Sequence, residues 1–268
     1  MFPPGVWPQY HLEVAVCGSR TFAVFVTSHL VTDVFGWYLT VLDIAAAYRD
    51  GAAWSPPPSV APHAVPASAA DPEAAVAHFR AVLPEAAPLP HWARRAGAAP
   101  LRGSGRSTTV DGTRAIAASR ALGVRPFSFL LAAHAVTAGC LGVGPVATVA
   151  VPLSNRRSGP DAANHRGVLV NSLPVSVDVA AEGRSFADLA RDVDRQVDEL
   201  IGFESFDLLR HADRIPGAAA AADAPTSFTM YPRPLAPRIG ERTGSHTGSG
   251  AGTCSSRCRS SSSARTPN

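Results

Sequence analysis

One short segment, residues 27–37, holds the side chains best suited to chemistry. His29 directly follows an apolar run, and Asp33 comes four residues later, ahead of a helical pattern. Imidazole accepts a proton near neutral pH more readily than other side chains do. A carboxylate at a helix start can cap backbone N–H groups or pair with a basic group. We therefore interpret His29 as a candidate catalytic residue and Asp33 as the residue that fixes its turn. A surface histidine beside an ordinary helix cap fits the same spacing, and spacing alone favours that alternative.

Two strands and a helix must position this segment. Residues 11–17 alternate in polarity and predict a strand. Residues 22–27 are almost wholly apolar, which predicts a short strand covered on both faces. A helix should follow Asp33 and end at Gly51. Its apolar stripe falls at helical spacing and consists of Trp37, Val41, Ile44 and Tyr48.

The rest of the chain divides at a proline-rich stretch. Residues 54–72 contain six prolines and predict an extended linker, after which Asp71 and Pro72 can begin a short helix through residue 82. Ser185 and Asp188 resemble a capping box ahead of the most amphipathic helix of the chain. The expected helices and strands of this second block are helices 113–122, 127–141 and 186–200 and strands 146–151, 166–179 and 227–231. Mixed strands and helices split by a linker indicate an α/β protein of two lobes.

Ser, Gly and Thr make up 17 of the last 30 residues. Such a composition buries too little apolar surface to offset ordering entropy, so we expect residues 239–268 to be disordered. Cys254 and Cys258 lie there without a second ligand pair, and we expect no metal site. Cys17 and Cys140 lie in apolar runs, where a buried position is the simplest expectation.

Charge and hydropathy exclude several classes of function. The formal net charge of +3 comes from the tail, so the first 238 residues are neutral and offer no basic face for nucleic acid. The longest apolar run, 127–136, contains His134 and is too short to span a bilayer. No secretory signal is visible, and we expect a soluble cytoplasmic protein without a membrane partner.

The segment Ser28-His29-Leu30-Val31-Thr32-Asp33-Val34 resembles the HHxxxDG motif of nonribosomal peptide synthetase condensation domains, in the chloramphenicol-acetyltransferase-like superfamily. Order and spacing agree with this family over roughly residues 10–235. The further matching segments are 122–134 (a helix after an "lgvt" turn), 151–157 ("gRnr"), 167–174 ("iGxfvNtlp"), 203–206 ("hqdvPFe") and 227–231 ("vmfny").

The resemblance implies a chloramphenicol-acetyltransferase-like fold of two α+β sandwich lobes, here a partial N-lobe and most of a C-lobe. Residues 1–52 would be the remnant of the N-terminal lobe and 53–100 a Pro/Ala-rich linker with a short helix. Residues 101–238 would form the C-terminal lobe, followed by the tail. The strands and helices that precede the motif in the family have no counterpart in the 28 residues before His29.

The implied reaction forms an amide bond between an acyl donor and an amine acceptor, each tethered to a carrier protein. The carrier proteins are the implied partners, and they bring the phosphopantetheine arms, so the chain itself would bind no cofactor. By the resemblance His29 either takes the nucleophile's proton or holds the nucleophile. Asp33 would be structural, held by an arginine earlier in the chain that we expect to be missing. Asn171 would support a strand that closes a tunnel between the lobes.

Two departures from the motif leave alternatives open. Ser28 replaces the first histidine, which related acyltransferases tolerate. Val34 replaces the glycine, and a β-branched side chain there would enter the reacting space or move the turn. The alternatives are therefore a truncated, inactive relic that binds at most a carrier protein, and an ester-forming acyltransferase of the same superfamily.

Overall fold

The structure is a computed structural model that describes residues 2, 5–18, 20–58, 71–83, 105–108, 111–157, 159–231, 238–239 and 242–243. The strands are β1 (Tyr10–Cys17), β2 (Arg20–Thr27), β3 (Val146–Leu153), β4 (Asn171–Asp178), β5 (Thr226–Ser227), β6 (Arg238–Ile239) and β7 (Arg242–Thr243). The α-helices are α1 (Val34–Asp50), α2 (Pro72–Val82), α3 (Thr113–Leu122), α4 (Pro126–Ala138), α5 (Pro160–Asn164), α6 (Phe186–Gly202) and α7 (Ala218–Ala222). Short helical turns are η1 (Gly51–Ala53), η4 (Gly139–Val143) and η5 (Leu209–His211).

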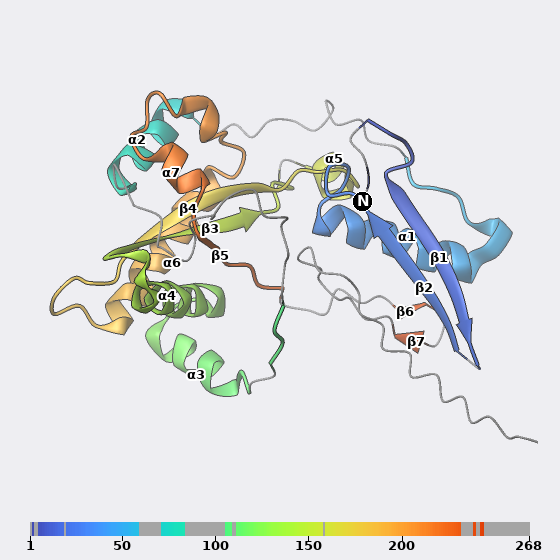
Figure 1. The fold of residues 1–268 in the computed structure, drawn as a ribbon, viewed down its shortest axis with the longest axis horizontal. Helices are drawn as coiled ribbons and strands as arrows, with labels where there is room; N and C mark the ends of the chain where they lie inside the picture. The colour runs from blue at the N-terminus through green and yellow to red at the C-terminus, as the bar shows by residue number, and fades with distance from the viewer. Residues whose placement is uncertain are drawn as a thin grey trace, which may run out of the picture.

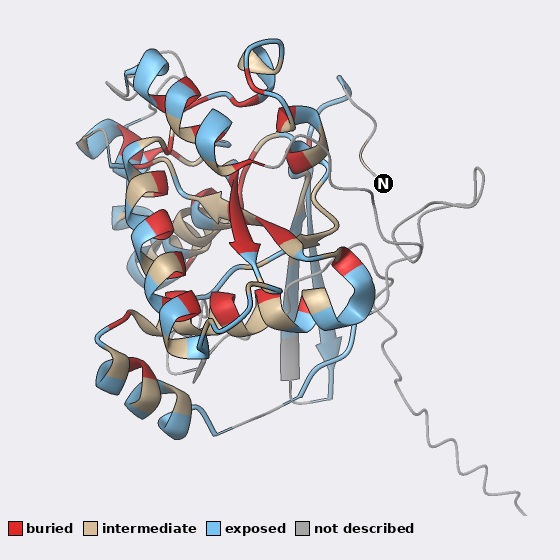
Figure 2. Ribbon diagram, turned by 90° about the vertical axis from the view of Figure 1, so that its left-hand side faces the viewer, coloured by how far each residue is buried: buried red, intermediate tan, exposed pale blue. Residues whose placement is uncertain are grey.

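The main core surrounds a three-stranded sheet with the order β4-β3-β5 (Figure 1). β3 and β4 pair antiparallel from Val146↔Asp178 to Leu153↔Asn171, and β5 pairs parallel to β3. Helices α4 and α6 pack against each other and against these strands, and α7 contacts both β3 and β4. Buried residues concentrate in this sheet and on the helix faces turned toward it (Figure 2).

The capping box predicted for α6 is confirmed. The Asp188 N–H donates to Ser185 Oγ at 3.2 Å, and the Ser185 N–H donates back to the Asp188 carboxylate. The apolar stripe of this helix is also buried in the core, through Leu189, Val193, Val197 and Leu200. Local capping chemistry and helical periodicity therefore fixed this element from the sequence.

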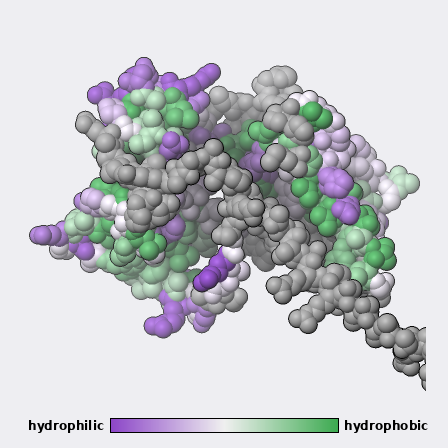
Figure 3. Space-filling view, viewed as in Figure 1, coloured by the Kyte–Doolittle hydropathy of each residue, from purple (hydrophilic) through white to green (hydrophobic). Residues whose placement is uncertain are grey.

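β1 and β2 form a separate antiparallel ribbon, paired from Tyr10↔Thr27 to Cys17↔Arg20. The expectation that residues 22–27 are covered on both faces is wrong: Phe22 is 49% exposed and Val24 is 50% exposed. β1 likewise exposes a row of large apolar side chains, and apolar surface gathers over this part of the molecule in Figure 3. Among the described residues no third strand pairs with the ribbon and no element packs on it extensively, so its apolar pattern lacks a covering layer.

Smaller expectations also need correction. Cys17 and Cys140 are exposed, because the first ends the uncovered ribbon and the second lies in the π-helical turn η4. The stripe of α1 is only half-buried, and its last member, Tyr48, is 73% exposed. The strand expected at 227–231 is only the two-residue β5, because the chain leaves the sheet after Ser227.

β6 and β7 form a small antiparallel pair at 238–243, across the expected start of the tail. The remaining tail residues, with Cys254 and Cys258, lie outside the described residues, as do 59–70 and 84–104 of the linker region. The short helix expected within that region is α2, with Asp71 as its N-cap and Pro72 in its first turn.

Helices α4 and η4 form one apolar stretch of 18 residues, 126–143, long enough to cross a membrane. The helical stretch is therefore longer than the apolar run identified in the sequence. Leu131, Ala132 and Ala135 are fully buried against the rest of the protein, and α4 contacts α6 and β3. One third of this 18-residue stretch is buried inside the protein.

Candidate functional site

A tight turn after β2 presents His29 to solvent. The Ser28 N–H donates to the Gln9 carbonyl at 2.9 Å, which anchors the start of the turn to the segment just before β1. The N–H of Leu30 donates to Ser28 Oγ at 3.3 Å, and the N–H of Val31 donates to the Ser28 carbonyl at 3.2 Å. A serine hydroxyl commonly stabilises turns in this way. His29 is exposed at the tip, and no side chain in the described part of the chain bonds to its imidazole.

The Asp33 carboxylate holds the other end of this segment. It is buried and caps α1, because Oδ1 accepts from the Gly36 N–H at 2.8 Å. Oδ2 accepts from the N–H groups of Leu169 and Val170 at 2.9 and 3.0 Å. The guanidinium of Arg156 adds two bonds, Nη2 to Oδ1 at 2.9 Å and Nη1 to Oδ2 at 3.0 Å. A carboxylate offers about four lone-pair sites, so Asp33 has no acceptor site left for a hydrogen bond to a substrate.

Arg156 completes this buried pair from the loop that follows β3. Its side chain is 4% exposed, as is that of Asp33. It also donates to the carbonyls of His165 and Gly167, at 3.1 and 3.0 Å, and lies over the Phe35 ring. Burial lowers the pKa of Arg156, and the adjacent Asp33 carboxylate opposes that shift. The pair is a bidentate ion pair that joins the start of α1 to the 154–170 loop.

The expectation that the arginine partner of Asp33 lies earlier in the chain and is missing is therefore wrong. The partner comes 123 residues later. The segment that resembles "gRnr" contains it, but no local spacing rule links two positions so far apart. Only the folded arrangement of α1 against the loop brings these charges together.

A second set of contacts fixes α1 on the same loop. Arg166 binds Asp43 through two hydrogen bonds, of 3.0 and 3.1 Å, and its carbonyl accepts from Thr32 Oγ1 at 2.6 Å. A Cβ added at Gly36 would lie 2.2 Å from that carbonyl oxygen, so only glycine fits there. The close backbone contact of the turn thus falls at Gly36, two residues after Val34. Whether Val34, the half-buried first residue of α1, obstructs a substrate stays a prediction.

Asn171 has a supporting position at the start of β4. Its Nδ2 donates to the carbonyls of Glu204 and Phe206, at 3.0 and 2.8 Å. The side chain therefore ties the 203–206 turn to the sheet. Its relation to a tunnel stays a prediction. The described residues contain no cluster of three or more His, Cys, Asp or Glu side chains that could hold a metal ion.

No known protein family matches the chain by sequence profile, and no curated protein is significantly similar to it. Solved structures do match. The first condensation domain of the calcium-dependent antibiotic synthetase, in complex with a substrate analogue, superimposes with a TM-score of 0.67 at 21% identity, over 88% of this chain and 55% of that chain.

The cyclization-docking bidomain of the EpoB nonribosomal peptide synthetase from Sorangium cellulosum gives a TM-score of 0.65 at 18% identity, over 80% of this chain and 46% of that one. SgcC5 from Streptomyces globisporus gives 0.56 at 19% identity, over 81% and 52%. The protein is thus of the mixed helix-and-sheet class to which these matched structures belong. More narrowly, it has the fold of nonribosomal peptide synthetase condensation domains, as the resemblance implied, and spans about half the length of the matched chains.

Proposed function

We propose that this chain is part of a condensation-type acyltransferase that joins an acyl group to an amine in nonribosomal peptide or related biosynthesis, in the cytoplasm. The observation that carries the proposal is the division of roles in the turn. Five hydrogen bonds commit Asp33 to structure, whereas the imidazole of His29 is exposed at the tip of the turn. The condensation-domain fold supports the same reaction class.

In this reaction the amine nitrogen attacks the thioester carbonyl carbon of the donor. A C–N bond forms and the C–S bond breaks, so the amine loses a proton and the carrier arm leaves as a thiol. His29 has two possible roles: it accepts the amine's proton, or it holds the nucleophile and polarises the tetrahedral centre. Asp33 and Arg156 act through the turn, because they set where its backbone lies.

The proposed partners are carrier proteins whose phosphopantetheine arms bring both substrates. One matched structure is a cyclization-docking bidomain of a synthetase, which supports a setting among other domains. The reaction class indicates this class of partner, since thioesters of this kind are carried on such arms.

An inactive remnant is the second candidate, and the exposed ribbon favours it. A sheet with apolar side chains on both faces is stable only when other layers cover it. The described residues leave Leu12, Val14 and Val24 about half exposed or more, at 50%, 60% and 50%. A chain in this state could retain a carrier-binding surface without the complete lobe that catalysis requires.

The decisive experiment mixes the purified protein with an acyl-loaded carrier protein and an amine acceptor, and follows product by mass spectrometry. We expect product from the wild type and none above background from His29→Ala. His11→Ala, which removes another exposed histidine, is the matched control and should retain the wild-type rate. Equal turnover by wild type and His29→Ala would eliminate His29 as the catalytic group, and no product from any variant would favour the remnant.

Two further arms refine the proposal. An alcohol acceptor with the same carbon skeleton as the amine separates ester formation from amide formation. Val34→Gly tests the valine, because removal of its side chain opens the space that the motif glycine would leave. A higher rate in Val34→Gly would show that the Val34 side chain hinders the reaction, whereas an unchanged rate would show that it does not.

A further inference from the structure

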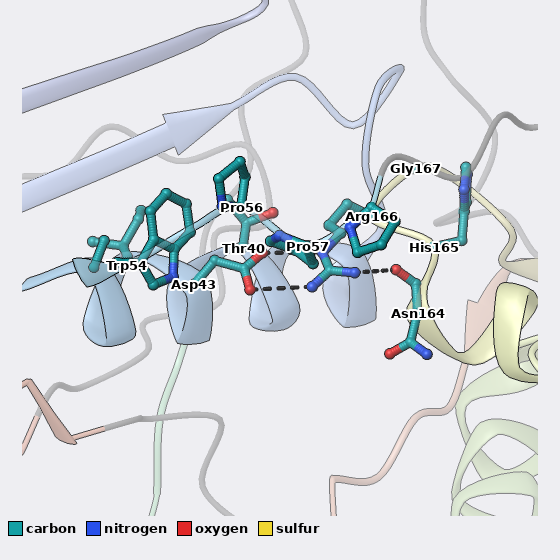
Figure 4. Close-up of a pocket in the computed structure, with 12 residues that line it drawn as sticks. Thr40, Asp43, Trp54, Pro56, Pro57, Asn164, His165, Arg166 and Gly167 are labelled. Atoms are coloured by element: carbon teal, nitrogen blue, oxygen red, sulfur yellow. Dashed lines mark hydrogen bonds and ion pairs between the residues drawn. The ribbon is translucent and has the colours of Figure 1, made fainter. Parts of the chain in front are cut away.

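A cavity of about 610 Å³ lies between α1, the proline-rich segment 54–58 and the loop 164–167 (Figure 4). Its volume falls in the range of roughly 300–1,000 Å³ that is typical of small-molecule sites. His29 is not among the residues that line it. The acyl-transfer reaction proposed above does not use this cavity, so a ligand could bind here whether or not His29 is catalytic.

The polar part of the cavity is an ion pair that retains hydrogen-bonding capacity. Arg166 donates from Nε and Nη2 to the Asp43 carboxylate and from Nη1 to the Asn164 carbonyl. A guanidinium has five N–H donors, so two have no partner among the described residues and remain for a ligand. The side chains of Arg166 and Asp43 are 28% and 27% exposed, which leaves both within reach. The pair thus offers donors and acceptors side by side with no net charge.

The apolar part of the cavity faces this pair. Trp54, Pro56 and Pro57 lie beside Asp43 and Arg166 (Figure 4). Ile44 and Ala47 of α1 also line the cavity and add aliphatic surface. Aromatic and proline rings provide flat surface for another apolar group. A ligand that fits both parts carries an apolar side chain next to a neutral group that accepts from Arg166 and donates to Asp43. The amide group has this combination of acceptor and donor.

We propose that this cavity binds small neutral ligands of the peptide-amide class, with an aromatic or aliphatic side chain against Trp54 and the amide on the Asp43–Arg166 pair. A free carboxylate at the same place would meet the Asp43 carboxylate. The carboxylate can accept from Arg166 but has no hydrogen to donate to Asp43, whose charge repels it, so the neutral amide is favoured. The ligand class is defined by this chemistry alone.

The test uses the whole chain labelled with 5-fluorotryptophan, whose signals report on each indole. Trp54→Phe removes one signal and so assigns it. We expect N-acetyl-L-phenylalaninamide to shift the Trp54 signal saturably at millimolar concentration. N-acetyl-L-phenylalanine, its carboxylate counterpart, should bind about tenfold more weakly or worse. An unshifted Trp54 signal, or equal affinity for the two probes, would overturn the proposal.

Two variants locate the site. Ala47→Phe fills the cavity and should abolish the shift, whereas Ala46→Phe, on the same helix but outside the lining, should not. Asp43→Asn removes the repelling charge and leaves Arg166 unneutralised, so the carboxylate probe should then bind at least as tightly as the amide. The other tryptophan signals show in each case that the fold is intact. Wild-type binding by Ala47→Phe, or an unchanged preference in Asp43→Asn, would contradict the assignment.

Discussion

At the scale of single residues, one carboxylate links three parts of the chain. Asp33 caps α1 through Gly36, holds the backbone of Leu169 and Val170, and pairs with Arg156. Charged hydrogen bonds of this kind contribute about 1.5–3 kcal/mol each, and loss of one partner leaves the other charge buried. The geometry thus explains why an aspartate in this motif is structural.

Arg156→Met tests this role. We expect the free energy of unfolding to fall by about 3–5 kcal/mol, because the Asp33 carboxylate remains buried without its counterion. Urea denaturation measures the loss. The control is Arg195→Met, since Arg195 forms its ion pairs with 59% of its side chain exposed and such pairs contribute about 1 kcal/mol or less. Equal losses in the two variants would show that the buried pair has no special role.

His134 should make stability depend on pH. Burial lowers its pKa, and its Nε2 is buried without a hydrogen-bond partner in the described structure. The unfolded chain, with an ordinary histidine pKa of about 6.5, therefore binds a proton at a pH where the folded chain does not. The contribution of His134 to the free energy of unfolding is therefore full above the unfolded-state pKa of about 6.5, and it is lost as the pH falls toward the folded-state pKa. Burial lowers the pKa of His78 as well, which adds to the same trend.

His134→Leu should remove part of this pH dependence. We expect the difference between urea midpoints at pH 7.5 and pH 5.5 to shrink, with little loss of stability at the higher pH because an apolar side chain fits the apolar surroundings. His11→Gln, at an exposed histidine, should leave the difference unchanged. A full wild-type difference in His134→Leu would assign the acid sensitivity to other groups.

At the scale of elements, α1 is held so closely against the 164–167 loop that one methyl group should disturb it. Gly36→Ala places a Cβ against the Arg166 carbonyl and should cost about 1–3 kcal/mol. Gly202→Ala, at the end of α6, meets open space and should be neutral or gain about 0.4–1 kcal/mol. Thermal unfolding of both variants provides the measurement. A harmless Gly36→Ala would mean that α1 sits farther from the loop than described.

The ribbon of β1 and β2 should bind hydrophobic dyes and promote association. Val14 and Val16 are 60% and 74% exposed on the same strand face. The double variant Val14→Thr, Val16→Thr keeps side chains that favour strands and should lower dye fluorescence and the aggregated fraction in sedimentation. Ala15→Thr, at a small side chain between them, is the control. Unchanged dye binding in the double variant would show that a covering layer protects the ribbon.

The sequence predicted those elements whose signals are local. Periodicity located α6 and β1, a continuous apolar run located β2, and the Asp71-Pro72 pair located α2. Burial of the ribbon was mispredicted. An apolar strand pattern indicates that a strand needs a covering layer, and the described residues do not provide that layer. Similarly, β5 is shorter than its apolar segment, since pairing with β3 ends at Ser227.

At the scale of the whole molecule, the fold class followed from the order of motifs, but the contacts that join its parts did not. The motif predicted that Asp33 is structural but did not identify Arg156 as its partner. The sequence likewise did not predict that Asp43 pairs with Arg166. The residues of each pair are 123 positions apart. The cavity beside that second pair was equally hidden, because its walls come from three separate segments. About half of the matched fold is present, so the activity itself stays a proposal.

The central claim is that the Asp33 carboxylate fixes the turn beneath His29, and amide hydrogen exchange tests it directly. The N–H groups of Gly36, Leu169 and Val170 lie in the first helical turn or outside a strand, so their protection depends on this carboxylate. The account predicts slow exchange at all three in the wild type and fast exchange in Asp33→Ala, with the β4 amide of Val175 protected in both. Exchange of these three amides at unprotected rates in the wild type would contradict it.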